Sequence, residues 1–318
     1  MTITCIISCA GYKKNIPVLT TCIRSLLKAR TKETKLILIV TTNNFQHVIK
    51  NPHINSIIVS PKKAGFVGIN NKAVKHSLLK KSNYYLIIND DAWVHKNFFS
   101  SLERECTTSK KGDVIVPLIY ETNKKNLDSF GVEYFRTGYP KNTSRQNIPS
   151  SLASMSCLLI KTDFLKKMVH QYGFFLNPIL VWYLDDVEFS IRALASGGTI
   201  YKCNKIIAYH QRTFTWGRKS YFVIYHSFRN QLWVMLLTWP LTIFKRNLLR
   251  VLLWQIMTAC YCLIKYTPLL YPKIIFSTVI NWKSLMKSRK KIIKNYTHVH
   301  VFNTMFSALE IRHDRLTF

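Results

Sequence analysis

The stretch Tyr84-Tyr85-Leu86-Ile87-Ile88-Asn89-Asp90-Asp91 decides the fold class expected for this chain. Its apolar run is typical of a buried strand, and the run ends in two adjacent carboxylates. Two like charges at a strand end raise the free energy of the fold unless a cation or hydrogen bonds compensate them. Only 15 acidic residues stand against 46 basic ones, which favours a divalent metal and a phosphate-bearing ligand here. A turn or a helix cap also uses Asp, so this stretch alone leaves both interpretations open.

Apolar strands and helical spacing alternate on both sides of this stretch. Strands are expected at 3–8, 36–40, 54–59 and 84–88, with helices at 17–27 and 70–79. Further strands are expected at 114–117, 155–160, 199–203 and 206–209, with helices from Asp163, as N-cap, and at 186–195. Residues 123–149 are polar and predict loops or a small ribbon. This order predicts an α/β protein with a Rossmann-type mixed, mostly parallel sheet flanked by helices.

The bulk composition indicates a folded protein with an anionic partner. The chain has 318 residues, of which 48% are hydrophobic, so it can bury a sizeable core. Its net charge of +31 fits nucleic acid, a phospholipid surface or a phosphorylated substrate. The 8 cysteines form no CxxC pair and lie mostly in apolar runs, which favours a reducing, cytosolic setting. The N-terminus lacks a basic segment of the kind that opens a signal peptide.

The sequence changes character after about Ser220. Apolar runs rich in Trp and Tyr follow, and Asp and Glu are absent between Glu188 and Glu310. Because Pro240 and several Lys and Arg residues interrupt these runs, they fall short of the roughly 20 apolar residues of a membrane span. We therefore expect helices lying in the membrane interface, with a polybasic cluster at 282–294 for anionic lipid headgroups. The expected division is an α/β domain at 1–220 and a basic, amphipathic helical membrane-associating region at 221–318.

A second acidic motif is Leu184-Asp185-Asp186-Val187-Glu188. Acids that open a helix are ordinary, because the helix dipole favours negative charge there. These, however, are the last acids for more than a hundred residues, which favours a function. Asp186 and Glu188 are expected on different sides of the turn, so that one can face a substrate while the other orients a neighbour.

Two weaker motifs complete the candidate site. The glycines of Gly65-Phe66-Val67-Gly68-Ile69-Asn70-Asn71 allow close backbone approach before a helix start, where amides bind an anion or a ribose; a plain loop is the alternative. His210 ends an apolar strand and is either structural or, near a metal, an imidazole ligand. Arg212, with Arg218 and Lys219, carries charge that suits a diphosphate.

Taken in order, these segments resemble family-2 glycosyltransferases with a GT-A fold, in particular bacterial rhamnosyl- and galactofuranosyl-type transferases of surface polysaccharide synthesis. That family runs from Gly-Phe-x-Gly-x-Asn-Asn through a strand ending in Asn-x-Asp to Glu-Asp-Val-Asp and then a His. The match covers roughly residues 3–230. The corresponding residues here are Gly65 to Asn71, Asn89-Asp90-Asp91, Asp185-Asp186-Val187-Glu188 and His210.

The resemblance implies a role for each matched residue. Asp91 takes the metal-binding "DxD" position, with Asp90 beside it, and His210 is a further metal or phosphate contact. Asp186 takes the position of the general base, and Asp185 stands where the family usually has Glu. The residues implied in binding the donor are Gly65, Asn70, Asn71, Asn89, Asp90, Asp185 and Arg212. Arg229-Asn230 matches an Arg-Asn pair that recurs before the C-terminal helices.

The resemblance also implies a reaction, a cofactor and partners. The donor is a nucleotide-diphospho-sugar, the cofactor is Mg²⁺ or Mn²⁺, and the sugar is transferred with inversion at the anomeric carbon. The acceptor is a hydroxyl of a lipid-linked glycan, which places the protein peripherally at the cytoplasmic face of a membrane. Two departures concern the nucleotide pocket: Thr41-Thr42-Asn43-Asn44 stands where the family has Asp-Asn, and Ser8-Cys9-Ala10-Gly11-Tyr12 replaces its usual first-strand ending.

Three rival functions remain open on the sequence. A basic nucleic-acid-binding protein fits the charge, but Trp and Tyr in long apolar runs suit a bilayer better than a phosphate groove, so no nucleic-acid partner is expected. A catalytically inactive membrane scaffold on the same fold fits the altered Thr41-Thr42 site. A nucleotidyltransferase would need a Gly-rich, Lys-containing loop after the first strand, and residues 10–17 are a poor version of one.

Overall fold

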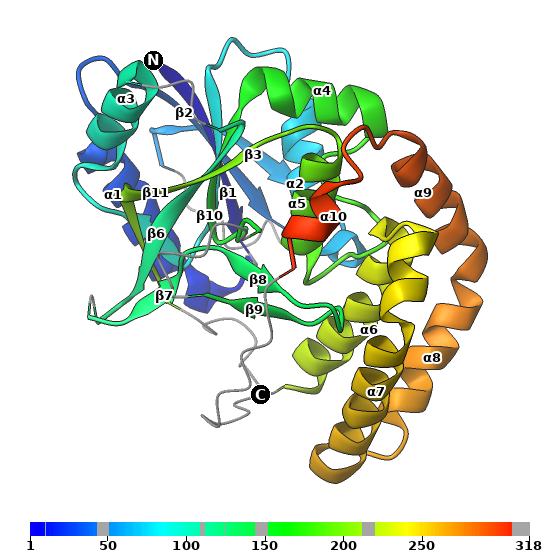
Figure 1. The fold of residues 1–318 in the computed structure, drawn as a ribbon. Coiled ribbons are helices and arrows are strands. Elements are labelled where there is room, and N and C mark those ends of the chain that lie inside the picture. Colours follow the sequence, from blue (N-terminus) through cyan, green and yellow to red (C-terminus); the bar gives the residue numbers. More distant parts are fainter. Residues whose placement is uncertain are drawn as a thin grey trace.

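A nine-stranded mixed sheet forms the centre of the molecule (Figure 1). The computed structural model describes residues 1–9, 11–42, 51–108, 112–123, 125–143, 152–211 and 220–306. The strands run in the order β3-β2-β1-β4-β10-β6-β11-β5, and β7 pairs with β6. They are β1 (Thr2–Cys9), β2 (Lys35–Thr42), β3 (Ile54–Val59), β4 (Tyr84–Asn89), β5 (Ala92–Val94), β6 (Val114–Glu121), β7 (Leu127–Ser129), β10 (Cys157–Lys161) and β11 (Ile200–His210).

The half of the sheet formed by β1 to β4 is parallel, as the apolar strands predict. β10 then runs antiparallel to both β4 and β6, so the sheet is mixed. The two strands expected at 199–203 and 206–209 form one strand, β11, with an irregularity between Cys203 and Ile207. Part of the polar segment expected as a small ribbon forms one, from β8 (Val132–Tyr134) and β9 (Pro140–Asn142).

Helices cover both faces of the sheet, because alternate residues of each strand point to opposite sides. On β1, Ile3, Cys5 and Ile7 share one hydrophobic cluster with residues of α1 and α3. Ile6 belongs to the cluster on the other face, with residues of α2, α4 and α5. The helices are α1 (Ile16–Ala29), α2 (Gly65–Ser77), α3 (Phe98–Thr108), α4 (Thr162–Tyr172) and α5 (Asp185–Ala195), and short 3-10 turns precede α1 (η1, Lys13–Asn15) and α2 (η2, Lys62–Ala64).

Two predictions about helix starts are wrong. α2 begins at Gly65, five residues before the expected start, and thus includes the whole Gly-Phe segment. Asp163 lies in the first turn of α4, whose N-cap is Lys161, so the carboxylate acts on the helix dipole without capping the helix.

Four further helices follow: α6 (Tyr221–Thr238), α7 (Leu241–Lys265), α8 (Leu270–Ile280) and α9 (Trp282–Lys294), with the short α10 (Val301–Thr304). Figure 1 shows α6 to α9 together on one side of the sheet, with α7 and α8 extending away from it. Trp233 and Trp239 are buried in the same hydrophobic cluster as the sheet, so these helices share the core of the α/β part. The division at 220/221 stays a prediction.

α7 differs from the interrupted runs that the sequence predicts. Lys245, Arg246 and Arg250 lie within one continuous helix of 25 residues, because Lys and Arg are good helix formers. By length and composition this helix can cross a membrane: its mean hydropathy reaches 1.5, and 22% of that window is buried. A single helix of this kind does not establish a membrane span.

Candidate active site

Asp90 and Asp91 follow β4 at the carboxyl edge of the parallel strands, where open α/β sheets bind ligands. Both are largely buried, at 5% and 7% exposure. The Asp90 carboxylate accepts a hydrogen bond from Asn15 Nδ2 at 3.0 Å, and its backbone N–H donates to Ser8 O. Asp90 is therefore tied to the elements around it, which suits a supporting role beside Asp91.

The imidazole of His210 lies between two carboxylates. Its Nε2 is 3.2 Å from Asp91 Oδ1, and its Nδ1 is 3.1 Å from Asp128 Oδ2. His210 is the last residue of β11 and pairs with Ala92 of β5, just after Asp91, so strand pairing brings the two candidate metal ligands together. Sequence reasoning missed Asp128, which lies on β7; the scarcity of acids was the only signal that marked it.

The Asp91–His210 pair fits a divalent cation. Two ligands at right angles around one cation, each about 2.1 Å from it, lie about 3 Å apart, close to the spacing seen here. No group of three or more His, Cys, Asp or Glu side chains that could hold a metal occurs among the described residues. A cation here therefore needs further ligands from water and phosphate, which is how Mg²⁺ usually binds.

Asp186 lies in the first turn of α5 and is partly exposed. Its Oδ1 accepts from the N–H of Val187 at 2.9 Å, and its Oδ2 accepts from the N–H of Met155 at 3.3 Å. Burial raises the pKa of Asp186, and these backbone hydrogen bonds oppose the rise. A partly exposed carboxylate with a raised pKa is a suitable general base.

Asp185 differs from its neighbour. It is only 4% exposed, and its Oδ2 has no hydrogen-bond partner within the described part of the chain. Burial, together with the charge of Asp186, raises the pKa of Asp185 well above the usual range. A second buried acceptor without a described partner, Asn89 Oδ1, lies at the end of β4. Both oxygens are buried acceptors without a hydrogen-bond partner among the described residues.

A short path of hydrogen bonds connects Asp186 to the Asp90-Asp91 pair. Asp186 binds the N–H of Met155, and the carbonyl of the next residue, Ser156, accepts from the N–H of Asn89 at 3.1 Å. Asn89 directly precedes the paired carboxylates. The two acidic motifs, far apart in the sequence, therefore meet at one edge of the sheet.

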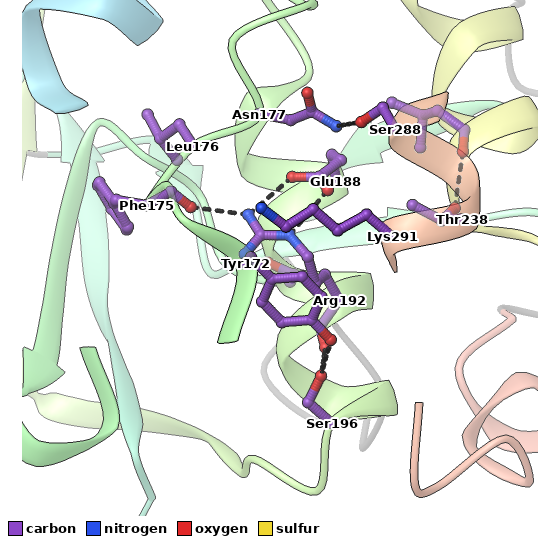
Figure 2. A network of polar contacts seen from close by, with 12 residues as sticks. Tyr172, Phe175, Leu176, Asn177, Glu188, Arg192, Ser196, Thr238, Ser288 and Lys291 are labelled. Atoms are coloured by element: carbon purple, nitrogen blue, oxygen red, sulfur yellow. Dashed lines mark hydrogen bonds and ion pairs between the residues drawn. The ribbon is translucent and has the colours of Figure 1, made fainter. Parts of the chain in front are cut away.

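The third acid of the second motif, Glu188, is structural. Glu188 and Arg192 are fully buried, and Arg192 Nε lies 2.8 Å from Glu188 Oε1 (Figure 2). Arg192 also donates to Phe175 O at 2.7 Å and lies over the rings of Tyr172 and Phe174. The prediction that Asp186 and Glu188 point to different sides is confirmed: one carboxylate reaches the sheet edge, and the other is neutralised inside the core.

The two asparagines of the Gly-Phe segment, Asn70 and Asn71, form hydrogen bonds within the protein. Asn70 accepts from Ser8 Oγ and donates to Phe66 O, both at 2.9 Å. Asn71 donates to Leu176 O and accepts from the N–H groups of residues 175 and 176. A role of Gly65, Asn70 and Asn71 in binding the donor stays a prediction.

Several predicted residues lie outside the described part of the chain: Ala10, Asn43, Asn44, Arg212, Arg218 and Lys219. Thr41 and Thr42 are fully buried, and the Thr41 hydroxyl donates to Ile7 O at 3.4 Å.

No protein-family model and no curated protein matches this sequence. Solved structures do match. GalNAc-T7 with UDP, GalNAc and Mn²⁺ superimposes on 85% of this chain with a TM-score of 0.56 and 13% identity. A fragment of S. aureus TarS in complex with UDP-GlcNAc covers 95% of it, with a TM-score of 0.56 and 14% identity. The mannosyltransferase PcManGT from Pyrobaculum calidifontis, with GDP-Man and Mn²⁺, also covers 95%, with a TM-score of 0.50 and 8% identity.

The chain has the GT-A fold. The fold class predicted from the motifs is confirmed by these structures, whose identities are low enough that they bear on the fold alone. The chain spans 58% of the GalNAc-T7 chain and 55% of a longer TarS chain, but 91% of the TarS fragment.

Proposed function

We propose that this protein is an inverting glycosyltransferase, which moves a sugar from a nucleotide-diphospho-sugar to a hydroxyl of a glycan. The observation that carries the proposal is the placement of two separate acidic centres, Asp91 with His210 and Asp186, at one edge of a GT-A sheet. Similar structures hold UDP-GlcNAc or GDP-Man, which supports a nucleotide-sugar donor.

In this mechanism Asp186 takes the proton of the acceptor hydroxyl. The acceptor oxygen forms a bond to the anomeric carbon as the bond from that carbon to the diphosphate oxygen breaks, and the diphosphate leaves with the electron pair. General-base catalysis of this kind contributes about 10²–10⁴ in rate. The raised pKa of Asp186 makes it a stronger base than an exposed carboxylate.

Asp91 and His210 would hold Mg²⁺ or Mn²⁺. The cation, when bound, supplies a Lewis acid that stabilises the charge of the departing diphosphate. Mn²⁺ is present in the GalNAc-T7 and PcManGT structures, which supports this cofactor. Asp128 orients His210 through Nδ1 and leaves Nε2 directed at Asp91.

We further propose a lipid-linked glycan acceptor and a peripheral position at the cytoplasmic face of a membrane, in the synthesis of cell-surface polysaccharide. Among the described residues, 18 large hydrophobic side chains are exposed, and 15 of them lie from Leu241 to Trp282, on α7, α8 and their ends. Such a concentration of exposed apolar residues marks an interaction surface. α9 adds six Lys and Arg residues, and no Asp or Glu occurs from 220 to 306.

The charge distribution favours an anionic bilayer over a second copy of the chain as the occupant of this surface. Two copies of a basic surface that lacks acids repel each other, whereas anionic lipid headgroups attract Lys and Arg. The resemblance of the motifs further suggests a hexosyl or rhamnosyl group as the transferred sugar.

The test is a donor screen with the purified full chain. UDP-, GDP- and dTDP-sugars are incubated with Mn²⁺ or Mg²⁺ and a polyprenyl-linked glycan, and release of nucleoside diphosphate is measured. We expect release from one class of donor that depends on acceptor and metal. Release from no donor in the presence of a lipid-linked acceptor would overturn the proposal.

A further inference from the structure

The turn that precedes the base-bearing helix has an unusual backbone. Val181, Tyr183 and Leu184 all have positive φ angles, of 62°, 65° and 58°. Residues with a Cβ rarely adopt this left-handed conformation, and a cluster of them persists only where surrounding contacts enforce it. Leu184 is the N-cap of α5, so the conformation of this turn sets where Asp185 and Asp186 point.

Asn230 of α6 holds this turn from one side. Its Nδ2 group lies within hydrogen-bonding distance of three carbonyl oxygens of the turn, those of Leu180, Trp182 and Tyr183, at 3.1, 2.5 and 2.8 Å. Its Oδ1 accepts from Arg229 Nε at 2.9 Å, which fixes the orientation of the amide. Every polar atom of this fully buried side chain is therefore used on the turn or on the group that orients it.

Arg229 extends the same contact. Its Nη2 donates to Leu180 O at 3.0 Å, and its guanidinium lies 4.2 Å from the centre of the Trp233 ring. Arg229 is largely buried, and this burial lowers the pKa of its guanidinium.

The Gly-Phe segment at the start of α2 also contacts the turn. The N–H of Val67 donates to Val181 O at 3.1 Å. A Cβ on Gly65 would lie 2.4 Å from that same carbonyl oxygen, so the absence of a side chain at Gly65 permits the approach. The turn is thus fixed between α2 and α6.

We infer that Asn230, oriented by Arg229, is a positioning residue for the reaction: it holds the turn at residues 180–184 in its left-handed conformation and so directs Asp186 to the sheet edge. The inference rests on the proposed function, in which Asp186 is the base. It also gives Asn230 of α6 a part in positioning the base, although the sequence of this helix opens the apolar C-terminal region. Misplacing a reacting group by about 1 Å costs about 100-fold in rate, so a loosened turn has a measurable effect.

The variant Asn230→Asp tests this positioning role with little change in the shape of the side chain. The carboxylate keeps an acceptor for Arg229 but loses the N–H donors, and it faces three carbonyl oxygens. Gln231→Glu is the matched control: it adds the same charge at the next position of α6, where the side chain accepts from Trp254 Nε1 at 2.9 Å. Both variants are compared with wild type in kcat, donor KM, Tm and hydrogen exchange.

We expect Asn230→Asp to lower kcat about 100-fold while the donor KM changes little. Exchange should accelerate at the amides of Val67 and Glu188, whose acceptors are the carbonyls of Val181 and Leu184. Gln231→Glu should keep the kcat and the exchange pattern of wild type even if its Tm falls equally. Wild-type kcat and wild-type exchange in Asn230→Asp would overturn the inference.

Two safeguards keep the test decisive. If Asn230→Asp does not fold, Arg229→Lys replaces it, because a lysine loses the paired contacts to Asn230 and Leu180. Wild-type values in that variant would also overturn the inference. If wild type itself transfers no sugar, the proposed function fails, and the exchange of the Val67 and Glu188 amides still shows whether Asn230 fixes the turn.

Discussion

His210 and Asp128 are joined through Nδ1 and Oδ2 at 3.1 Å, and the Asp128 side chain is only 1% exposed. The opposite ring nitrogen of His210 lies 3.2 Å from Asp91. A carboxylate that accepts the Nδ1 proton fixes the tautomer in which Nε2 can bind a cation. The nearly buried Asp128 would therefore act through His210 on a cation bound at the proposed site.

Asp128→Asn should weaken Mn²⁺ binding by about 10–100-fold, the usual effect of losing a carboxylate behind a metal-binding histidine. Isothermal titration calorimetry with Mn²⁺ and UDP or GDP present measures this directly. At saturating Mn²⁺ the variant should regain most of its kcat, because the ligands themselves remain.

Glu121→Gln serves as the control for Asp128→Asn. Glu121 pairs with His210 in the strand register, but its carboxylate accepts from the exposed Asn123 and Asn126. This variant should bind Mn²⁺ as wild type does. Equal losses in both variants would mean that general electrostatics, and not the contact to His210, set the affinity.

Asp186→Asn should lower kcat by about 10²–10⁴ with little change in donor KM, because a base is needed only for the chemical step. The raised pKa of Asp186 also predicts a pH profile. Activity requires the ionised form, so kcat/KM should fall as the pH drops through this raised pKa, at a higher pH than the usual 3.8. Initial rates measured across the acidic pH range determine this side of the pH–rate profile.

Asp163→Asn is the matched control, since Asp163 also lies in the first turn of a helix but is exposed. It should leave both kcat and the pH profile unchanged. An Asp186→Asn variant with wild-type kcat would remove Asp186 from the role of base.

Much of this fold could be predicted from the sequence, because most strands of the sheet are short, continuous apolar runs, which are typical of buried strands. β1, β2 and β4 are buried on both faces over most of their length, so nearly every one of their residues is apolar or small. α3 was not predicted, although Phe98, Phe99 and Leu102 are buried in the core and Asn97, a favoured N-cap residue, directly precedes the helix. The helical start at Gly65 was also missed, because glycine usually favours a turn.

The acidic centre was predictable in its parts but not in its connections. Scarcity of acids marked Asp91 and Asp186, and the place of His210 at the end of an apolar strand marked it as a candidate ligand. Asp128 and Asn230 act through contacts between strands or helices that are distant in the sequence, and no local spacing indicates such contacts.

Asp185→Asn should stabilise the protein at neutral pH. The pKa of Asp185 is raised in the folded state, so folding favours the protonated form, and the free energy of unfolding falls as the pH rises from 3.8 through the folded pKa. An uncharged Asn avoids this loss. We expect Tm to rise by about 2 °C or more at pH 7, and the gain to vanish near pH 4.

Thermal unfolding at a series of pH values measures the effect, with Asp163→Asn as a control whose exposed charge is already in water. Because Asp185 is implied in donor binding, the stabilised variant should also bind the donor more weakly. The quantity to compare is the Tm of Asp185→Asn minus the Tm of wild type at each pH. A difference of zero at pH 7, or one that is smaller at pH 7 than at pH 4, would contradict the predicted sign.

The exposed face of α7 gives a prediction about membranes. Leu249, Leu253 and Ile256 are 70%, 54% and 60% exposed and lie on neighbouring turns of one helix face. Replacing all three by Ser should weaken binding to phosphatidylglycerol-containing vesicles at least about tenfold, because their apolar surface no longer enters the bilayer. Leu79→Ser is the control, since Leu79 is 96% exposed and lies in the N-terminal part of the chain. In co-sedimentation this control should bind the vesicles as wild type does. Wild type should bind phosphatidylcholine vesicles more weakly, and high salt should also weaken its binding, because the basic residues of α9 are attracted to anionic headgroups. Equal binding of the triple variant and wild type would exclude α7 from the membrane contact.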